Sequence, residues 1–363
     1  MQKIEITVSP DYVAKWTIVD AVRELLQNAI DAKTAGHDMH VIYHENTDEL
    51  VIISEGAKLD IASLLLGSTS KANDTASIGQ FGEGYKIATL VLLRNNKTIT
   101  FENGLAKETW RPRFIKSRRF GCNVLGFFIE RWPPFTPAKD SLVITVQGIT
   151  NEEYDEQIVP SALMLMPGWN TLEVTEYGNI ISIPGAVYVN GLFVKQHEPY
   201  DYGYNFKPQY LSLDRDRKLV SDFDLEWLAS KMWSRSADTD KVLELIEKNA
   251  ADTKYLASVN GNTALAIAAW EKFIKEYGKN AVPVTTQEEL EKISSKYRPV
   301  IVHSGMYSLI TSCGKYDPPD DEDEESLADK FLTWFKDYDC SHLLVSAGED
   351  AFMKLVEEVR KLE

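Results

Sequence analysis

Three polar side chains recur on one face of an otherwise apolar segment near the start of the chain. Glu24, Asn28 and Asp31 are spaced four and three residues apart, so on a helix they can converge on a single ion or water molecule. The flanking residues supply an apolar face at helical spacing: Val19, Val22, Leu25, Leu26, Ala29 and Ile30. The pattern predicts an amphipathic helix with carboxylates at the margin of its apolar face, ending near Gly36.

A glycine-rich segment follows about fifty residues later. Residues 79–86 read Gly-Gln-Phe-Gly-Glu-Gly-Tyr-Lys, and the apolar run Ile87–Leu93 after them predicts a buried helix. Glycines let backbone amides approach an anion closely, and the start of a helix adds its positive end. We therefore expect an anion-binding loop, and its candidate residues are Gly79, Gln80, Phe81, Gly82, Gly84, Tyr85 and Lys86.

The order and spacing of these two segments resemble the Bergerat ATP-binding fold. That superfamily includes gyrase B, heat-shock chaperone and mismatch-repair ATPases, and sensor histidine kinases. The resemblance covers roughly residues 10 to 150, with weaker similarity to about residue 220. It implies ATP and Mg²⁺ as bound groups, with Glu24 as the general base on the attacking water, Asn28 holding Mg²⁺, and Asp31 supporting the site through water. The residue types suit those roles, because a carboxylate accepts a proton and an amide oxygen is a ligand for a hard cation.

The adenine-reading motif of the superfamily, Asp-x-Gly-x-Gly, is altered in this chain. Ser54 stands at the aspartate position, Gly56 matches the first glycine, and Lys58 replaces the second. A serine hydroxyl both accepts and donates hydrogen bonds, so it discriminates between bases less than a carboxylate does. Two outcomes remain open: ATP held with altered adenine contacts, or a pocket that has lost tight nucleotide binding.

Further contacts are implied by the same resemblance. A lid over the phosphates would fall in residues 67–77, with Ser68 and Lys71 as contacts, although the composition equally predicts a solvated loop. A hydroxyl on a late strand would be Ser141, with Thr145 as the second choice. A cation sent back to the γ-phosphate from a second domain would be Arg215 or Arg217, with Lys218 beside them; a surface charge cluster is the alternative.

The charge balance restricts the partners. The net charge of −16 disfavours general attraction to nucleic acid, and the basic stretch 107–119 with its interleaved aromatics is the one candidate for it. A β-hairpin edge kept soluble by charge is the favoured interpretation of that stretch. No leader-like N-terminus or membrane-length apolar run is present, and three widely spaced cysteines predict buried thiols in a cytosolic protein without membrane attachment.

The pattern along the chain predicts an α+β protein of three parts. Residues 1–150 form the Bergerat-type nucleotide domain, an α/β sandwich. Residues 151–235 form a β-rich, transducer-like domain with a hairpin at Asn190-Gly191. Residues 236–363 form a mainly helical or small α/β module, with helices over 241–257 and 264–277, a capping box at Thr286 and Glu289, and short strands at 300–302 and 343–345.

We therefore expect slow, Mg²⁺-dependent ATP hydrolysis that drives a conformational change. The alternative is a non-hydrolysing nucleotide-binding or pseudo-ATPase scaffold that acts through a protein partner, for which the C-terminal module is the candidate surface. Nucleotide-dependent homodimerisation is a further expectation from the resemblance.

Overall fold

The fold is that of a computed structural model, which describes residues 1–34, 36–64, 84–211, 221–259, 263–293, 296–318, 331–334 and 346–362. It contains helices, a large antiparallel sheet and a helical C-terminal region, so the predicted α+β class is confirmed. The chain divides into two compact units: unit 1 is Met1–Ser236 with Ala250–Thr253, and unit 2 is Ala237–Asn249 with Lys254–Glu363. The predicted nucleotide and transducer-like regions therefore lie together in unit 1.

Unit 1 contains a seven-stranded sheet in the order β1-β6-β5-β4-β7-β3-β2. All its neighbouring strands pair antiparallel. Its strands are β1 (Gln2–Ile6), β2 (Met39–His44), β3 (Glu49–Glu55), β4 (Thr98–Asn103), β5 (Glu108–Lys116), β6 (Asn123–Arg131) and β7 (Ser141–Gln147). Buried and less buried residues alternate along β3 and β7, so one face of the sheet faces the core.

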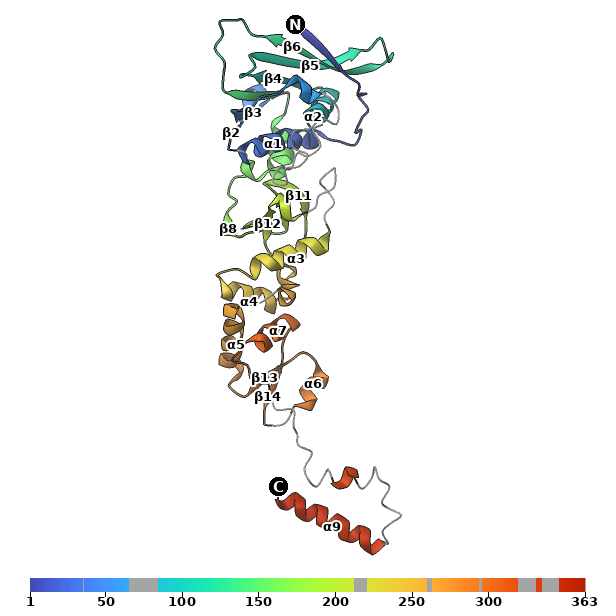
Figure 1. The fold of residues 1–363 in the computed structure, drawn as a ribbon, viewed down its shortest axis with the longest axis vertical. Coiled ribbons are helices and arrows are strands. Elements are labelled where there is room, and N and C mark those ends of the chain that lie inside the picture. Colours follow the sequence, from blue (N-terminus) through green and yellow to red (C-terminus); the bar gives the residue numbers. More distant parts are fainter. Residues whose placement is uncertain are drawn as a thin grey trace. The chain divides into compact units, whose positions relative to one another are not determined.

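Two helices cover that face (Figure 1). They are α1 (Ile18–Thr34) and α2 (Gly84–Arg94), and they pack against each other as well as against the sheet. A capping box starts α1, because the Thr17 amide donates to Asp20 (2.8 Å) and the Asp20 amide donates to the Thr17 hydroxyl (3.3 Å). Gly36 follows the end of α1 with a φ of 98°, as the predicted helix end requires. The run Ile87–Leu92 of α2 is buried, which confirms the expected helix.

Unit 1 also contains a five-stranded sheet in the order β11-β10-β12-β9-β8. Its strands are β8 (Thr171–Val174), β9 (Gly178–Ile181), β10 (Ala186–Val189), β11 (Leu192–Gln196) and β12 (Gly203–Phe206). Asn190 and Gly191 both take positive φ between β10 and β11, so the predicted hairpin is confirmed. Ile158, Ala162 and Leu192 belong to the same hydrophobic core as α1 and the seven-stranded sheet.

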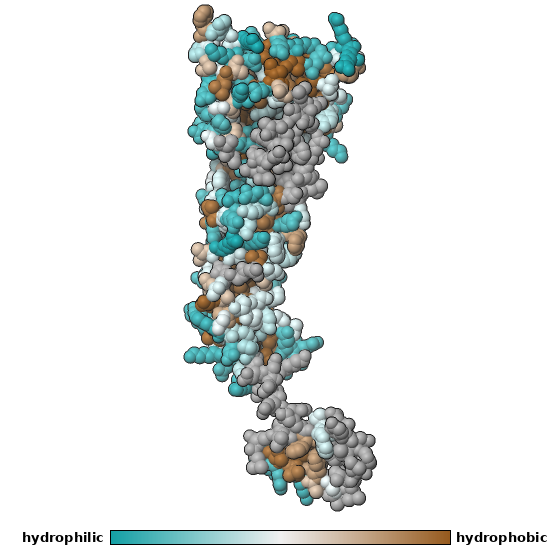
Figure 2. All heavy atoms as spheres, in the orientation of Figure 1, coloured by the Kyte–Doolittle hydropathy of each residue, from teal (hydrophilic) through white to brown (hydrophobic). Residues whose placement is uncertain are grey.

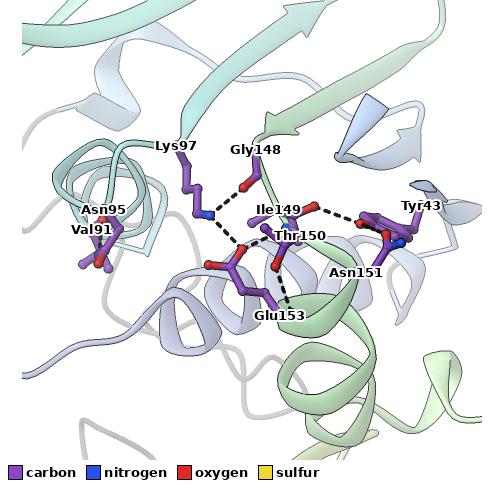
Figure 3. Close-up of polar contacts among 9 residues, drawn as sticks. All are labelled: Tyr43, Val91, Asn95, Lys97, Gly148, Ile149, Thr150, Asn151 and Glu153. Carbon is purple, nitrogen blue, oxygen red and sulfur yellow. Dashed lines mark hydrogen bonds and ion pairs between the residues drawn. The ribbon is translucent and has the colours of Figure 1, made fainter. Parts of the chain in front are cut away.

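A polar junction ties the end of the first sheet to the segment that follows it (Figure 3). The Lys97 ammonium donates to the Gly148 carbonyl (2.5 Å) and to Glu153 (2.7 Å). Glu153 also accepts from the Thr150 amide (2.9 Å), and Tyr43 donates to the Ile149 carbonyl (2.9 Å). Both members of the Lys97–Glu153 ion pair are largely shielded from water, so the pair is screened less than a surface pair would be.

The helix α3 (Asp222–Trp233) closes unit 1 over a buried polar cluster, which we call the Asp252 cluster. The Asp252 carboxylate accepts from the Tyr204 hydroxyl (2.5 Å), from the Asp201 amide (2.9 Å) and from the Tyr202 amide (3.3 Å). Trp233 of α3 donates its indole N–H to the Tyr204 oxygen (2.8 Å). This cluster joins β12, α3 and the turn Ala251–Thr253, which lie far apart in the sequence.

Unit 2 contains a two-stranded parallel ribbon with helices packed around it. The ribbon and these helices are α4 (Thr239–Glu247), α5 (Thr263–Tyr277), β13 (Ala281–Val284), α6 (Gln287–Lys292), β14 (Arg298–Ile301) and α7 (Ser304–Ser312). The helix α9 (Ser346–Leu362) also falls within the residues of unit 2. The predicted capping box at Thr286 and Glu289 is present and starts α6. Figure 2 shows hydrophobic residues at the surface of α9, where Met353 and Leu355 are exposed. The predicted strand at 343–345 lies outside the described residues.

Three expectations are corrected by these observations. The helix predicted over 241–257 ends at Glu247, because Asn249 takes a left-handed φ of 54° and short helical turns follow. The basic stretch 107–119 is a hairpin strand, but β5 lies inside the sheet between β6 and β4 and not at its edge. Cys122 is exposed, so only Cys313 is a buried thiol among the cysteines that the structure describes.

Within the described residues, every helix is too short or too polar to cross a membrane.

Candidate functional site

The polar stripe of α1 lies at the boundary between the helix pair and its surroundings. Glu24 and Asn28 are half-buried, and Asp31 is almost completely buried. The next positions on the helix, including Leu25, Leu26 and Ala29, are buried in the core. The apolar face therefore fixes the rotation of the helix, and that rotation leaves Glu24 and Asn28 partly accessible.

The orientation of the Asn28 amide is fixed by the helix itself. Its Nδ2 donates to the backbone carbonyl of Glu24 at 2.8 Å. With the nitrogen engaged, the side-chain oxygen is the remaining polar atom, and it accepts no hydrogen bond from any described residue. The site thus presents one oriented neutral oxygen, which is a suitable ligand atom for a hard cation such as Mg²⁺.

The first residue of α2 lies directly against this stripe. A Cβ atom built on Gly84 would come within 2.6 Å of Glu24 Oε2 and within 3.2 Å of Asn28 Nδ2. A side chain at residue 84 would therefore displace the end of the Glu24 side chain, whereas glycine leaves the carboxylate where it is. The structure thus brings Glu24, Asn28 and Gly84 together, although about sixty residues separate them in the sequence.

The two residues after Gly84, Tyr85 and Lys86, have different environments. Burial, and secondly the negative charge of Asp31, raise the pKa of the Tyr85 hydroxyl well above its usual range, so this group is a protonated donor at neutral pH. Lys86 is buried and donates its ammonium to the Ser63 carbonyl at 2.8 Å. Lys86 therefore anchors the chain before residue 65 instead of presenting an exposed charge.

The predicted base-reading residue, Ser54, belongs to the face of the seven-stranded sheet that α1 and α2 cover. Ser54 of β3 is buried, and it pairs with Leu142 of β7, which in turn pairs with Asn103 of β4. Asn103 was not identified from the sequence. Its amide donates to the Leu59 carbonyl (2.6 Å) and accepts from the Leu59 amide (3.4 Å), so it holds the loop after β3 against the sheet. The available signal was a polar residue on the buried phase of an alternating strand.

Gly56 takes a φ of 66°, and its neighbour in space is a histidine. A Cβ atom on Gly56 would lie 2.5 Å from His37 Nδ1. The imidazole therefore packs against the glycine that follows the base-reading position, and a side chain at residue 56 would collide with it.

The pairing register places the candidate hydroxyls Ser141 and Thr145 on the other face. Ser141 pairs with Glu55, while its neighbour Leu142 pairs with the buried Ser54. Successive residues of a strand point to opposite faces, so Ser141 and Thr145 belong to the face that α1 and α2 do not cover. The residue of β7 on the covered face beside Ser54 is Leu142.

Nine candidate residues lie outside the described residues. They are Ser68, Lys71, Gly79, Gln80, Phe81, Gly82, Arg215, Arg217 and Lys218. Where the structure describes the chain, no group of three His, Cys, Asp or Glu residues has the arrangement of a metal site. A cation at Asn28 would thus need most of its remaining ligands from water or from a bound anion, which is usual for Mg²⁺.

The comparisons with known proteins leave the family open. No protein-family model matches the chain. The chain is similar to a protein of Mycoplasma pneumoniae (strain ATCC 29342 / M129) that bears the name "Uncharacterized protein". The two are 25% identical over 220 residues, which is 58% of this chain and 87% of the Mycoplasma protein.

Proposed function

We propose that unit 1 binds ATP together with Mg²⁺ and hydrolyses it slowly, as a divergent protein of the Bergerat type. One observation carries the proposal: the first residue of α2 is a glycine in contact with both the carboxylate and the amide of the polar stripe on α1. Two segments that resemble one superfamily by sequence therefore meet in space, at the two residues to which the resemblance assigns catalysis and cation binding.

In this proposal Glu24 acts on water. Its carboxylate accepts a proton as the water oxygen bonds to the γ-phosphorus, while the bond from that phosphorus to the β,γ-bridging oxygen breaks. The products are ADP and inorganic phosphate, and Glu24 returns its proton to solvent. Asn28 would hold Mg²⁺ through its side-chain oxygen, and the bound cation would neutralise charge on the phosphates.

The remaining residues orient the groups. Burial and, secondly, the charge of Asp31 raise the pKa of the Tyr85 hydroxyl, so Tyr85 would be a neutral neighbour of the carboxylate that the resemblance assigns to the water network. Ser54 would contact the base, and the clamp from Asn103 to Leu59 keeps the loop beside it in place. A serine there predicts weaker discrimination between ATP and GTP than a carboxylate would give.

A non-hydrolysing scaffold is the second candidate, and the packing near Gly56 favours it. His37 lies against Gly56, where the resemblance implies contact with the base, and Lys86 is engaged with Ser63. In this case unit 1 would bind nucleotide weakly or not at all, and the molecule would act through a protein partner.

The test combines binding and turnover on the full chain. Calorimetric titration with ATP and Mg²⁺ should show binding by the wild type, and Asn28→Ala should weaken it at least about tenfold. Phosphate release should fall about a hundredfold in Glu24→Gln, whereas Glu291→Gln, at an exposed position of α6, should keep the wild-type rate.

The outcomes separate the two candidates. Wild-type turnover by Glu24→Gln would remove the assigned base. Absence of binding of any nucleotide to the wild type would reject the ATPase and leave the scaffold.

A further inference from the structure

Unit 1 contains a cavity that none of the site residues above lines. Its volume is about 780 Å³, within the range of small-molecule sites. One side is formed by the last turns of α1 and by β2, the edge strand of the large sheet. The other side is formed by the turn Leu163–Leu165 and by the Asn190–Gly191 turn of the second sheet. We call it the inter-sheet cavity.

The walls of the inter-sheet cavity are mainly apolar. Ile30 and Leu163 form buried parts of the lining, with Val41 and Ile53 beside them. Two large apolar side chains of the lining remain exposed: Ile42 at 42% and Met164 at 40%. Apolar groups gathered at a concave surface are covered favourably by an apolar ligand, because that removes them from water.

Two ionisable side chains of the cavity lining are basic. Lys33 and His40 line the cavity, and no aspartate or glutamate does. Lys33 makes no ion pair within the described part of the chain. In a chain with a net charge of −16, a concave surface with basic groups and no carboxylate selects for a negative ligand.

An amide adds a fixed donor. The Asn205 side-chain oxygen accepts from the Gly191 amide at 2.7 Å, which orients the side chain. Its NH₂ group then lacks an acceptor among the described residues, and Asn205 lines the cavity. A donor held in place by its own second hydrogen bond is suited to an oxyanion.

We propose that the inter-sheet cavity binds a small amphipathic anion, with an apolar acyl or aryl body and a single carboxylate-like head. The apolar part of the ligand covers Ile42, Met164 and the buried apolar lining. Its anionic group pairs with the Lys33 ammonium and accepts a hydrogen bond from the Asn205 NH₂ group. A triphosphate does not fit this lining, because Lys33 is its single permanent cation and most of its walls are apolar. The site shares helix α1 with the candidate nucleotide site but uses other residues of it, and it does not depend on the proposed ATPase activity.

Dodecanoate tests the site directly, with 8-anilinonaphthalene-1-sulfonate as a competing fluorescent aryl anion. Titration calorimetry on the full chain should give one saturable site for dodecanoate, at a concentration below that at which it forms micelles. Dodecylamine should bind at least about tenfold more weakly. Saturating ATP with Mg²⁺ should not displace dodecanoate, which separates this site from the one around Glu24.

Two matched pairs of variants locate the binding. Met164→Glu places a carboxylate in the cavity at an exposed position and should weaken dodecanoate binding about tenfold. Met353→Glu changes another exposed methionine, on α9, and should have no effect. Lys33→Gln should weaken dodecanoate about threefold, and Lys279→Gln should not. Each variant is first shown to keep the wild-type circular dichroism spectrum and urea midpoint.

Several results would overturn the proposal. They are absence of saturable dodecanoate binding, equal binding of dodecylamine, displacement by ATP, and wild-type affinity in Met164→Glu. A cavity that serves a peptide instead would give the first of these.

Discussion

Unit 1 contains two polar clusters of opposite character. In the Asp252 cluster, a completely buried carboxylate accepts three hydrogen bonds from protein donors. In the polar stripe of α1, the Asn28 side-chain oxygen accepts no hydrogen bond from the described residues, and the neighbouring residue of α2 is Gly84. A cluster with its acceptors filled by the protein holds elements together, whereas an oriented oxygen left without a donor is available to a ligand.

Asp252→Ala should have the largest effect of the tests of this comparison. The change leaves the Tyr204 hydroxyl and two backbone N–H groups buried without their acceptor, so it should destabilise unit 1 by about 3 kcal/mol. Urea unfolding measures the loss, and Asp317→Ala, at an exposed position of unit 2, should stay within about 0.5 kcal/mol of wild type. A loss as small as that of the control would show that this cluster does not hold the fold together.

Gly84→Ala tests the polar stripe of α1 most directly. The added methyl meets the far end of the flexible Glu24 side chain, so we expect the fold to persist and the carboxylate to move. Phosphate release should fall about tenfold, with a smaller effect on the urea midpoint. Gly314→Ala is the matched control, because a methyl there meets no neighbour within 4 Å. Unchanged turnover in Gly84→Ala would remove this contact from the proposed mechanism.

The smallest expected effect concerns Tyr200, whose buried hydroxyl lacks a hydrogen-bond partner among the described residues. Burial, helped by the charges of Asp252 and two other carboxylates, raises the pKa of this hydroxyl far above its usual range. The folded chain therefore keeps the proton that the unfolded chain loses near pH 10, so the associated stability is present below about pH 10 and is lost at higher pH.

Tyr200→Phe should consequently change stability at pH 7 by less than about 1 kcal/mol and should move alkaline unfolding to higher pH. Circular dichroism recorded against pH measures both effects, with Tyr307→Phe, in unit 2, as the control. A shift to lower pH in Tyr200→Phe would contradict the assignment of a buried hydroxyl without a partner.

Local patterns account for the parts of the fold that sequence analysis recovered. The spacing of apolar residues defines α1 and α2, the Asn190-Gly191 pair defines a hairpin, and Thr286 with Glu289 defines the start of α6. Each of these signals acts within a few residues, so no tertiary information is needed to read it.

The parts that were missed depend on long-range contacts or on single backbone angles. The Asp252 cluster joins residues about fifty positions apart, and the Asn103 clamp joins residues 44 positions apart. Ser141 is one position away from Leu142, which belongs to the face that α1 and α2 cover. Side chains alternate between faces along β7, so Ser141 belongs to the opposite face. The early end of α4 follows from the left-handed angle at Asn249, which asparagine permits but does not require.

The shared core of unit 1 determines how the molecule can be divided. Ile158, Ala162 and Leu192 pack with residues of the first 150 positions, and Lys97 joins the exit of α2 to Glu153. A chain cut after residue 150 would expose the apolar surface that those three side chains cover and would leave Lys97 without its carboxylate. The smallest piece of this protein that could be transplanted with its polar stripe intact is therefore unit 1 as a whole.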